Sequence, residues 1–272
     1  MDLLTHQGDG RVNFWSKPFV KRHDDLLFAL LPITGSHILY LVDEWLKAGG
    51  VSLDARGPLF ERYLRQQVIE DMRQRGFFCH DHSGIITLSN GKFEEIDLLL
   101  EFRHCLLLAE IKCIGYPLEA RDKYNAHKRV AQAANQVNRK ANFISANQPA
   151  LIASLPSKPL VKVVLTNYPL LSGLVVAGVP VTDAPFLHHY IADGSSRQGL
   201  TSIDAQGNRD YSKSKLIRYY EDELTFCQNL RHYLAHPVFV ESTRQYCSWR
   251  VANTVADLFV EFASVDFSVA NT

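Results

Sequence analysis

One segment, residues 93–113, constrains the fold more than any other, because its pattern predicts two adjacent β-strands. Polar and apolar residues alternate from position 93 and lead into an apolar run, so 93–100 is predicted to be the first strand. Residues 102–104 are predicted to form a turn, and 105–112 a second strand that begins as a buried apolar run.

Charged side chains interrupt this apolar pattern where the strands approach one another. Because side chains in a strand alternate between faces, Glu110 and Lys112 share one face while Ile111 points to the other. Asp97 occupies a corresponding place in the preceding strand. Burying carboxylates and an ammonium beside an apolar sheet is costly unless each meets an opposite charge, a metal or a substrate. We therefore expect these three side chains to converge at one edge of the sheet.

A divalent cation satisfies both acids of this group. Asp97 and Glu110 offer the hard oxygen ligands that Mg²⁺ prefers, and Lys112 then lies beside a metal-bound water, an arrangement suited to phosphodiester hydrolysis. The simpler alternative is a strand edge with a Glu–Lys ion pair. A second set of metal-capable residues, 79–82 (Cys-His-Asp-His), points in alternate directions and has no partner cluster at metal-site spacing.

The order and spacing of these residues resemble the PD-(D/E)XK nucleases, the restriction-endonuclease-like superfamily. Asp97 matches the first acid of that motif, Glu110 and Lys112 match its E-X-K, and Glu61 matches the acid on the helix before the sheet. Ile96 stands where the family name has proline, a departure the family tolerates.

The resemblance covers residues 57–190, about half of the chain, and implies an α/β fold with an α-β-β-β-α-β core and a mixed sheet flanked by helices. It implies a nuclease-like core at 56–192, an N-terminal strand and helix extension at 1–55, and a mainly helical C-terminal extension at 193–272. In the latter, 215–235 has the periodicity of an amphipathic helix, 193–212 is loop-like, and 251–262 fits a helix or a strand.

By the same resemblance the chain is expected to be a Mg²⁺-dependent nuclease, with Mn²⁺ as an alternative ion and with endonuclease or exonuclease action left open. The metal ligands would be the Asp97 and Glu110 carboxylates, the Ile111 carbonyl and Glu61, directly or through water. Lys112 would orient the attacking water. A glutamine on the following helix approaches the active site in several relatives, which points to Gln136 or Gln132. The implied catalytic set is Glu61, Asp97, Glu110, Lys112 and Gln136.

Nucleic acid, most simply DNA, is the expected partner, although the formal net charge of +0 removes the general electrostatic argument for it. Residues 121–140 hold six Lys or Arg against one acid, in a predicted helix over 123–144 that directly follows the acidic strands. These basic residues are candidates for phosphate contacts, which dominate nucleic-acid affinity. The simpler interpretation is that they form an ordinary solvent-exposed face of the helix. The expected contacts are Lys128, Arg129, Lys140 and Arg65.

Composition sets the remaining limits. Five cysteines without C-x-x-C spacing suggest neither a disulfide framework nor a zinc site and fit a reducing cytoplasm. The apolar runs are far shorter than the ~20 residues of a membrane helix, so no membrane association is expected. The N-terminal segment reads like part of a longer multidomain protein, and phage defence is one setting for such a chain. A homo-oligomer stays open, as do two alternatives: a catalytically inactive nucleic-acid-binding or protein-binding module, and another metal-dependent phosphohydrolase.

Overall fold

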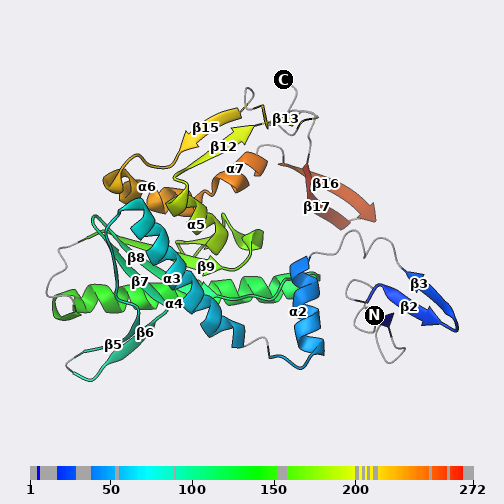
Figure 1. Ribbon diagram of the computed structural model, residues 1–272, viewed down its shortest axis with the longest axis horizontal. Helices are drawn as coiled ribbons and strands as arrows, with labels where there is room; N and C mark the ends of the chain where they lie inside the picture. Colours follow the sequence, from blue (N-terminus) through cyan, green and yellow to red (C-terminus); the bar gives the residue numbers. More distant parts are fainter. Residues whose placement is uncertain are drawn as a thin grey trace.

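A six-stranded mixed sheet forms the centre of the computed structural model (Figure 1). Across the sheet its strands are β10 (Val175–Val176), β11 (Val179–Asp183), β9 (Leu160–Thr166), β8 (Leu106–Lys112), β7 (Leu98–Phe102) and β4 (Cys79–Asp81). β8, β9 and β11 run parallel, β7 is antiparallel to both β4 and β8, and β10 is antiparallel to β11. The structure describes residues 5–6, 17–28, 38–52, 55–88, 90–151, 158–199, 202–203, 206, 209–210, 214–244, 247–255 and 258–265.

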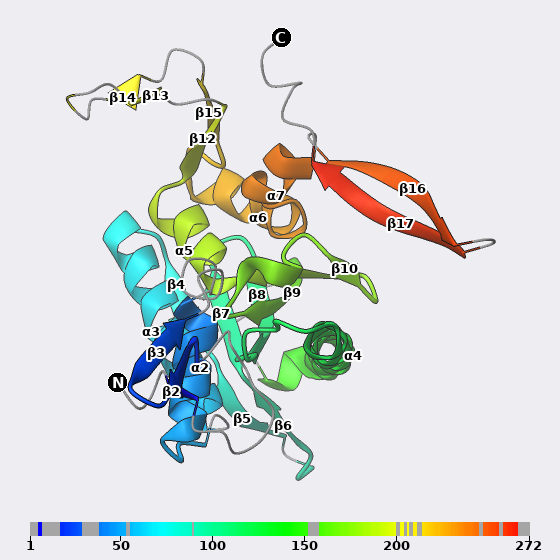
Figure 2. The ribbon, with the colours of Figure 1, turned by 90° about the vertical axis from the view of Figure 1, so that its right-hand side faces the viewer.

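Helices cover both faces of this sheet, as expected for an α/β protein. Figure 2 shows α4 (Ala120–Leu151) end-on along one face, with α3 (Arg56–Arg75) and α5 (Ala184–Ala192) on the other side. Each face has its own apolar core, one formed with α4 and the other with α3, α5 and α6 (Glu223–Ala235). In chain order, α3 is followed by β4, by the pair β5 (Gly84–Thr87) and β6 (Phe93–Ile96), and then by β7, β8, α4 and β9. If only the strands of the central sheet are counted, these elements come in the order helix, three strands, helix, strand.

The two central strands fall where the alternation predicts them, with one break. Leu98 and Leu100 pack in the core beneath α3, whereas Leu99 packs against α4, so both faces of β7 are buried. The first predicted strand is divided at Asp97 into β6 (Phe93–Ile96) and β7.

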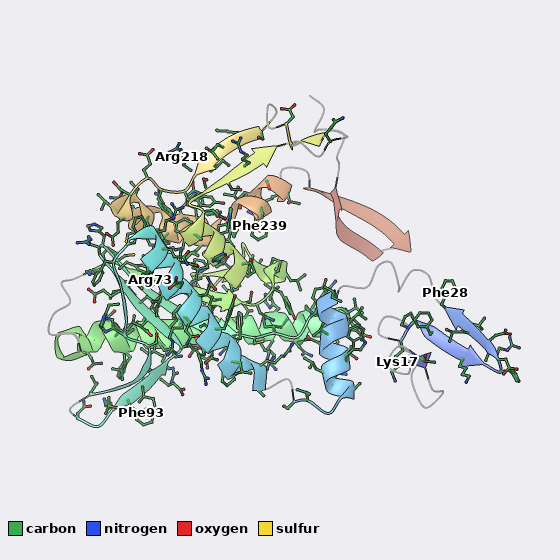
Figure 3. All side chains as sticks on the ribbon, in the orientation of Figure 1. Lys17, Phe28, Arg73, Phe93, Arg218 and Phe239 are labelled. Carbon is green, nitrogen blue, oxygen red and sulfur yellow. The ribbon has the colours of Figure 1, made fainter. Side chains whose placement is uncertain are left out.

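Two short strand-like runs before β6, 77–79 and 85–88, flank the turn-like residues 81–84, so their sequence predicts a hairpin, but they do not pair with each other. β4 joins the central sheet by pairing with β7, and β5 (Gly84–Thr87) pairs antiparallel with β6 instead. Figure 3 shows Phe93 on this β5–β6 hairpin, away from the central sheet. Asp97 therefore lies where the chain leaves the hairpin and enters the sheet.

Both flanking helices follow their predicted apolar stripes. In α3, Leu64, Val68 and Met72 are buried, and the helix ends at Gly76, whose φ of 70° is left-handed and favours glycine. In α4 the inner face consists of small residues, which lets the helix lie close on the sheet. These buried residues are Ala126, Val130, Ala133, Val137 and Ala141.

The expectation of a mainly helical C-terminal region is wrong. β15 (Ser214–Arg218) occupies the start of the predicted helix 215–235 and pairs antiparallel with β12 (Ser195–Gly199). α6 begins only at Glu223, because Asp222 caps it: the Asp222 carboxylate accepts from Thr225 N at 2.7 Å, and Thr225 Oγ1 accepts from Asp222 N at 3.0 Å. Further elements of this region are β13 (Ser202–Ile203), β14 (Arg209–Asp210), α7 (Val238–Arg244), β16 (Cys247–Val255) and β17 (Leu258–Val265).

The C-terminal region is not separate from the sheet. The rings of Tyr190 and Tyr219 stack with centroids 5.4 Å apart, and Phe226 and Leu230 lie in the same buried core as β7 and β8. Residues on both sides of the expected boundary at 192 thus share one core.

The N-terminal region contains β1 (Thr5–His6), β2 (Phe19–Arg22), β3 (Asp25–Phe28) and α2 (Ile38–Ala48). β2 and β3 form an antiparallel pair, in agreement with the turn-like residues 22–25 between two apolar runs. Ser36, a residue type that favours the start of a helix, lies outside the described residues. Within the described part of the chain, no helix is both long and apolar enough to span a bilayer.

Candidate functional site

Asp97 joins three elements at one edge of the sheet. Its Oδ2 atom accepts a hydrogen bond from the Ile111 backbone N–H of β8 at 2.9 Å, and its Oδ1 atom accepts from Lys140 Nζ of α4 at 2.8 Å. Its backbone carbonyl accepts from Arg65 Nη2 of α3 at 2.9 Å. The break between β6 and β7 lets this residue turn from one strand pair to the next while its carboxylate faces β8.

Glu110 is almost fully buried, with 2% of its surface exposed. Its Oε1 atom accepts from Lys112 Nζ at 2.6 Å, and its Oε2 atom accepts from Lys140 Nζ at 2.6 Å. Ile111 packs in the core beneath α3, whereas the partner of Glu110 comes from α4 on the opposite face. The predicted alternation of these three residues is therefore confirmed.

Lys140 lies inside the protein, which corrects its expected role as a surface phosphate contact. Only 4% of its surface is exposed, and its ammonium donates to both Asp97 and Glu110. Burial alone lowers the pKa of a lysine, but these two hydrogen bonds and charges outweigh it and raise the pKa of Lys140 above its ordinary value. The ammonium is thus a permanent cation between the two acids at neutral pH.

Glu61 faces the same charges from α3. Burial raises the pKa of its carboxyl group, and the negative charges of Asp97 and Glu110 raise it further, while Lys112 opposes them. Glu61 also lines the same pocket as Lys112.

A pocket of about 310 Å³ opens beside Lys112. Glu61, Lys112 and Arg129 line it together with the backbone of Gly57 and Gly115. Arg56 lines it as well, so one acid and three basic residues border a space large enough for a phosphate group, next to the pair Asp97 and Glu110.

The donor atoms suit Mg²⁺ only as a two-carboxylate site. Among the described residues, no group of three or more His, Cys, Asp or Glu side chains is arranged to hold a metal ion. Mg²⁺, however, commonly binds through one or two carboxylates and takes its other ligands from water and substrate phosphate. Asp97 and Glu110 meet this requirement, since oxygens from both already share one cation.

The other predicted residues differ in position. Arg65 is half-buried and donates to the backbone carbonyl of Asp97, so it helps to fix the position of that residue. Lys128 and Arg129 are exposed on α4, and Arg129 also lines the pocket. Gln136 is half-buried one helical turn before Lys140.

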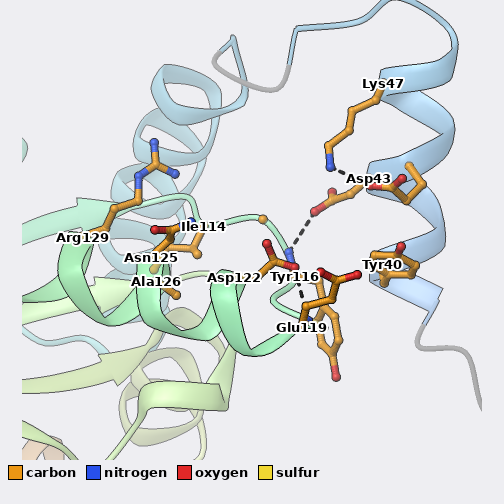
Figure 4. Close-up of a pocket in the computed structure, with 12 residues that line it drawn as sticks. Tyr40, Asp43, Lys47, Ile114, Tyr116, Glu119, Asp122, Asn125, Ala126 and Arg129 are labelled. Atoms are coloured by element: carbon orange, nitrogen blue, oxygen red, sulfur yellow. Dashed lines mark hydrogen bonds and ion pairs between the residues drawn. The ribbon is translucent and has the colours of Figure 1, made fainter. Parts of the chain in front are cut away.

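The N-terminal extension forms one wall of a second pocket, next to the site. Asp43 of α2 is buried, binds the guanidinium of Arg56, and accepts from Tyr116 N at 3.0 Å. Figure 4 shows the resulting pocket of about 390 Å³ between α2 and the start of α4. Arg129 and Gly115 line both pockets, so the two are neighbours.

The sequence contains an indication of both unexpected features, the buried Lys140 and the buried Asp43. Lys140 is three residues after Val137 and directly before Ala141, which places it beside the apolar stripe of α4. Asp43 lies between Val42 and Trp45 of the amphipathic helix, so an acid there also borders an apolar face.

Comparison of the chain with protein-family models, with curated proteins and with solved structures found no match. What the fold and the site define is therefore a class only: a mixed α/β protein with a cluster of two buried or half-buried acids and two lysines at a sheet edge.

Proposed function

We propose that this chain is a divalent-metal-dependent nuclease with a restriction-endonuclease-like core. The order α3, β4, β7, β8, α4, β9 supports this, as does the pairing of neighbouring strands: antiparallel from β4 to β7 and β7 to β8, then parallel from β8 to β9. Glu61 lies on α3 and Glu110 and Lys112 lie on β8, whereas Asp97 lies between β6 and β7, directly before the strand that pairs with β8.

One observation carries the proposal. Carboxylate oxygens of Asp97 and Glu110, which come from two segments of the chain, both lie within 2.8 Å of one nitrogen, Lys140 Nζ. Lys112 is bonded to the free side of Glu110 and faces the pocket. Two acids that converge on one cation beside a half-buried lysine suit metal-assisted phosphodiester hydrolysis.

Each side chain has a role in this reaction. Asp97 and Glu110 would hold Mg²⁺, which would supply Lewis-acid activation of the phosphate and of a water molecule. Lys112 would orient the attacking water and offset negative charge that develops on the phosphate. Glu61 lines the same pocket as Lys112 and would contribute to the metal site directly or through water.

Arg129 and Lys128 are the proposed phosphate contacts. Both are exposed on α4, and Arg129 lies at the pocket where the scissile phosphate would bind. Lys140 has no part in this contact in the metal-free arrangement, because its ammonium is directed at the two acids.

A substrate panel tests the proposal. The protein is incubated with supercoiled plasmid, linear duplex, single-stranded DNA, RNA and nucleotides, each with Mg²⁺, Mn²⁺ or EDTA. We expect DNA cleavage with either ion, none in EDTA, and none by identically purified Asp97→Asn. Hydrolysis of nucleotides alone would identify another phosphohydrolase. Full cleavage by Asp97→Asn would reject the site.

The second candidate is a nuclease-like fold that binds nucleic acid without cutting it. The buried ammonium of Lys140 favours this candidate, because it satisfies both acids without a metal. Binding that is unaffected by EDTA, together with no cleavage under any condition of the panel, would support it.

A further inference from the structure

Lys140 occupies the point at which the proposed metal ion would bind. Its nitrogen is 2.8 Å from Asp97 Oδ1 and 2.6 Å from Glu110 Oε2. Mg²⁺ coordinates carboxylate oxygens at about 2.1 Å, so a bridging ion and this ammonium would overlap in space and repel each other. The two cations therefore exclude one another.

Once displaced, the ammonium needs another anion. Lys140 comes from the buried face of α4, and an unpartnered charge in such a place is costly. Its long, flexible stem allows the ammonium to move while the helix stays in place. Glu110 cannot fully compensate, since its other oxygen is already bonded to Lys112.

A substrate phosphate would supply that anion. Under the proposed function, the phosphodiester binds the same metal ion and therefore arrives within reach of the displaced ammonium. Glu61 is the one acid in the described lining of the pocket, and it already shares that lining with three basic residues, Arg56, Lys112 and Arg129. A substrate phosphate would bring negative charge that these residues do not already neutralise.

We propose that Lys140 is an exchangeable counterion that couples divalent-metal binding to phosphodiester binding. Without substrate, its ammonium holds Asp97 and Glu110 together and competes with the metal. With substrate, the ammonium transfers to the phosphate and the acids accept the metal. This inference rests on the proposed function and adds a regulatory step to the same site.

Mn²⁺ binding provides the test, measured by calorimetry and by the loss of the free-ion EPR signal, with and without a phosphorothioate DNA duplex. The duplex is expected to tighten Mn²⁺ binding to the wild type about tenfold or more, within the usual range of coupling between sites. Lys140→Met is expected to bind Mn²⁺ about tenfold more tightly than the wild type without DNA, and to show almost no further gain with it.

Lys158→Met is the matched control. Lys158 is also a largely buried lysine, donating to Glu101 Oε1 at 2.6 Å and to the Phe102 carbonyl at 2.8 Å, but it lies at the opposite end of β7 from Asp97. Its removal should leave both Mn²⁺ affinities at their wild-type values. Lys140→Gln, which keeps hydrogen-bond donors without the charge, replaces Lys140→Met if the latter does not fold.

The outcomes separate this inference from the proposed function. Equal Mn²⁺ affinity of wild type and Lys140→Met without DNA, or an equal effect of the duplex on both, would overturn the exchange while leaving the metal site in place. If the duplex leaves the Mn²⁺ affinity of the wild type unchanged, that result alone would overturn the proposed exchange. Failure of every protein to bind Mn²⁺ would instead remove the metal site itself.

Discussion

Replacing Asp97 by alanine is expected to destabilise the protein as well as stop its reaction. The substitution removes two hydrogen bonds, one from the Ile111 N–H and one from the Lys140 ammonium. Lys140 is buried, but it keeps its bond to Glu110. The loss in the free energy of unfolding should therefore be larger than for a substitution at the surface and smaller than for the removal of an entire buried ion pair.

The magnitude follows from these contacts. Leaving a buried N–H without an acceptor costs about 1–3 kcal/mol. Breaking a buried ion pair completely costs about 3–5 kcal/mol, and the bond from Lys140 to Glu110 that persists reduces this part to about 1 kcal/mol. Asp97→Ala should therefore lower the free energy of unfolding by roughly 2–4 kcal/mol. Asp97→Asn keeps an acceptor for Ile111 and should lose only about 1–2 kcal/mol.

Urea unfolding in EDTA, followed by circular dichroism, measures both values. Asp25→Ala serves as a control, because Asp25 is exposed in β3 and its removal should change the stability by less than about 0.5 kcal/mol. An unfolding free energy of Asp97→Ala within that margin of the wild type would refute the reasoning. Equal losses in Asp97→Asn and Asp97→Ala would show that the Ile111 hydrogen bond contributes nothing.

Three further outcomes follow from the same geometry. Lys112→Ala should reduce the rate of DNA cleavage at least about a hundredfold. It should change the free energy of unfolding by less than about 1 kcal/mol, because the Lys112 ammonium is partly solvated, and urea titration measures this change separately from the cleavage rate. Glu61→Gln should stabilise the protein at pH 7–8 by less than about 1 kcal/mol, since the raised pKa of Glu61 makes its charged form unfavourable in the folded state. The gain in stability should vanish below about pH 4, where the Glu61 carboxyl group holds its proton in both the folded and the unfolded protein. Thermal melts at several pH values measure it, and a gain that persists below about pH 4 would show that the charge of Glu61 is not its cause. Arg129→Ala should weaken DNA binding and lower the slope of log affinity against log salt by about one, whereas Arg73→Ala, at the far end of α3 and paired with Glu70, should change neither.

Local periodicity is sufficient to predict the elements that hold the site. Alternation in segment 93–113 predicts β7 and β8, and the face shared by Glu110 and Lys112 follows from the same rule. The stripe of small residues in α4 predicts which side of that helix meets the sheet. In each case, a single repeating pattern determines the direction of the side chain.

Features that depend on distant partners could not be predicted in this way. Lys140 lies at the margin of the α4 stripe, where periodicity allows it to face either solvent or core, and only the two acids on the sheet decide its direction. Segment 215–235 has a helical pattern throughout, but pairing with β12 converts its first residues to strand and the Asp222 cap sets where the helix begins. The bond between Asp43 and Arg56 likewise joins two segments that sequence alone does not align.

The most direct measurement is the single-turnover rate of DNA cleavage in Mg²⁺ for wild type, Glu110→Gln and Lys158→Met. Glu110→Gln keeps the size of the buried side chain but removes the charge that would bind the metal. We expect it to cut at least about a hundredfold more slowly, with Lys158→Met within about threefold of the wild type. A Glu110→Gln protein that cuts DNA at the wild-type rate would contradict a hydrolytic site at this sheet edge.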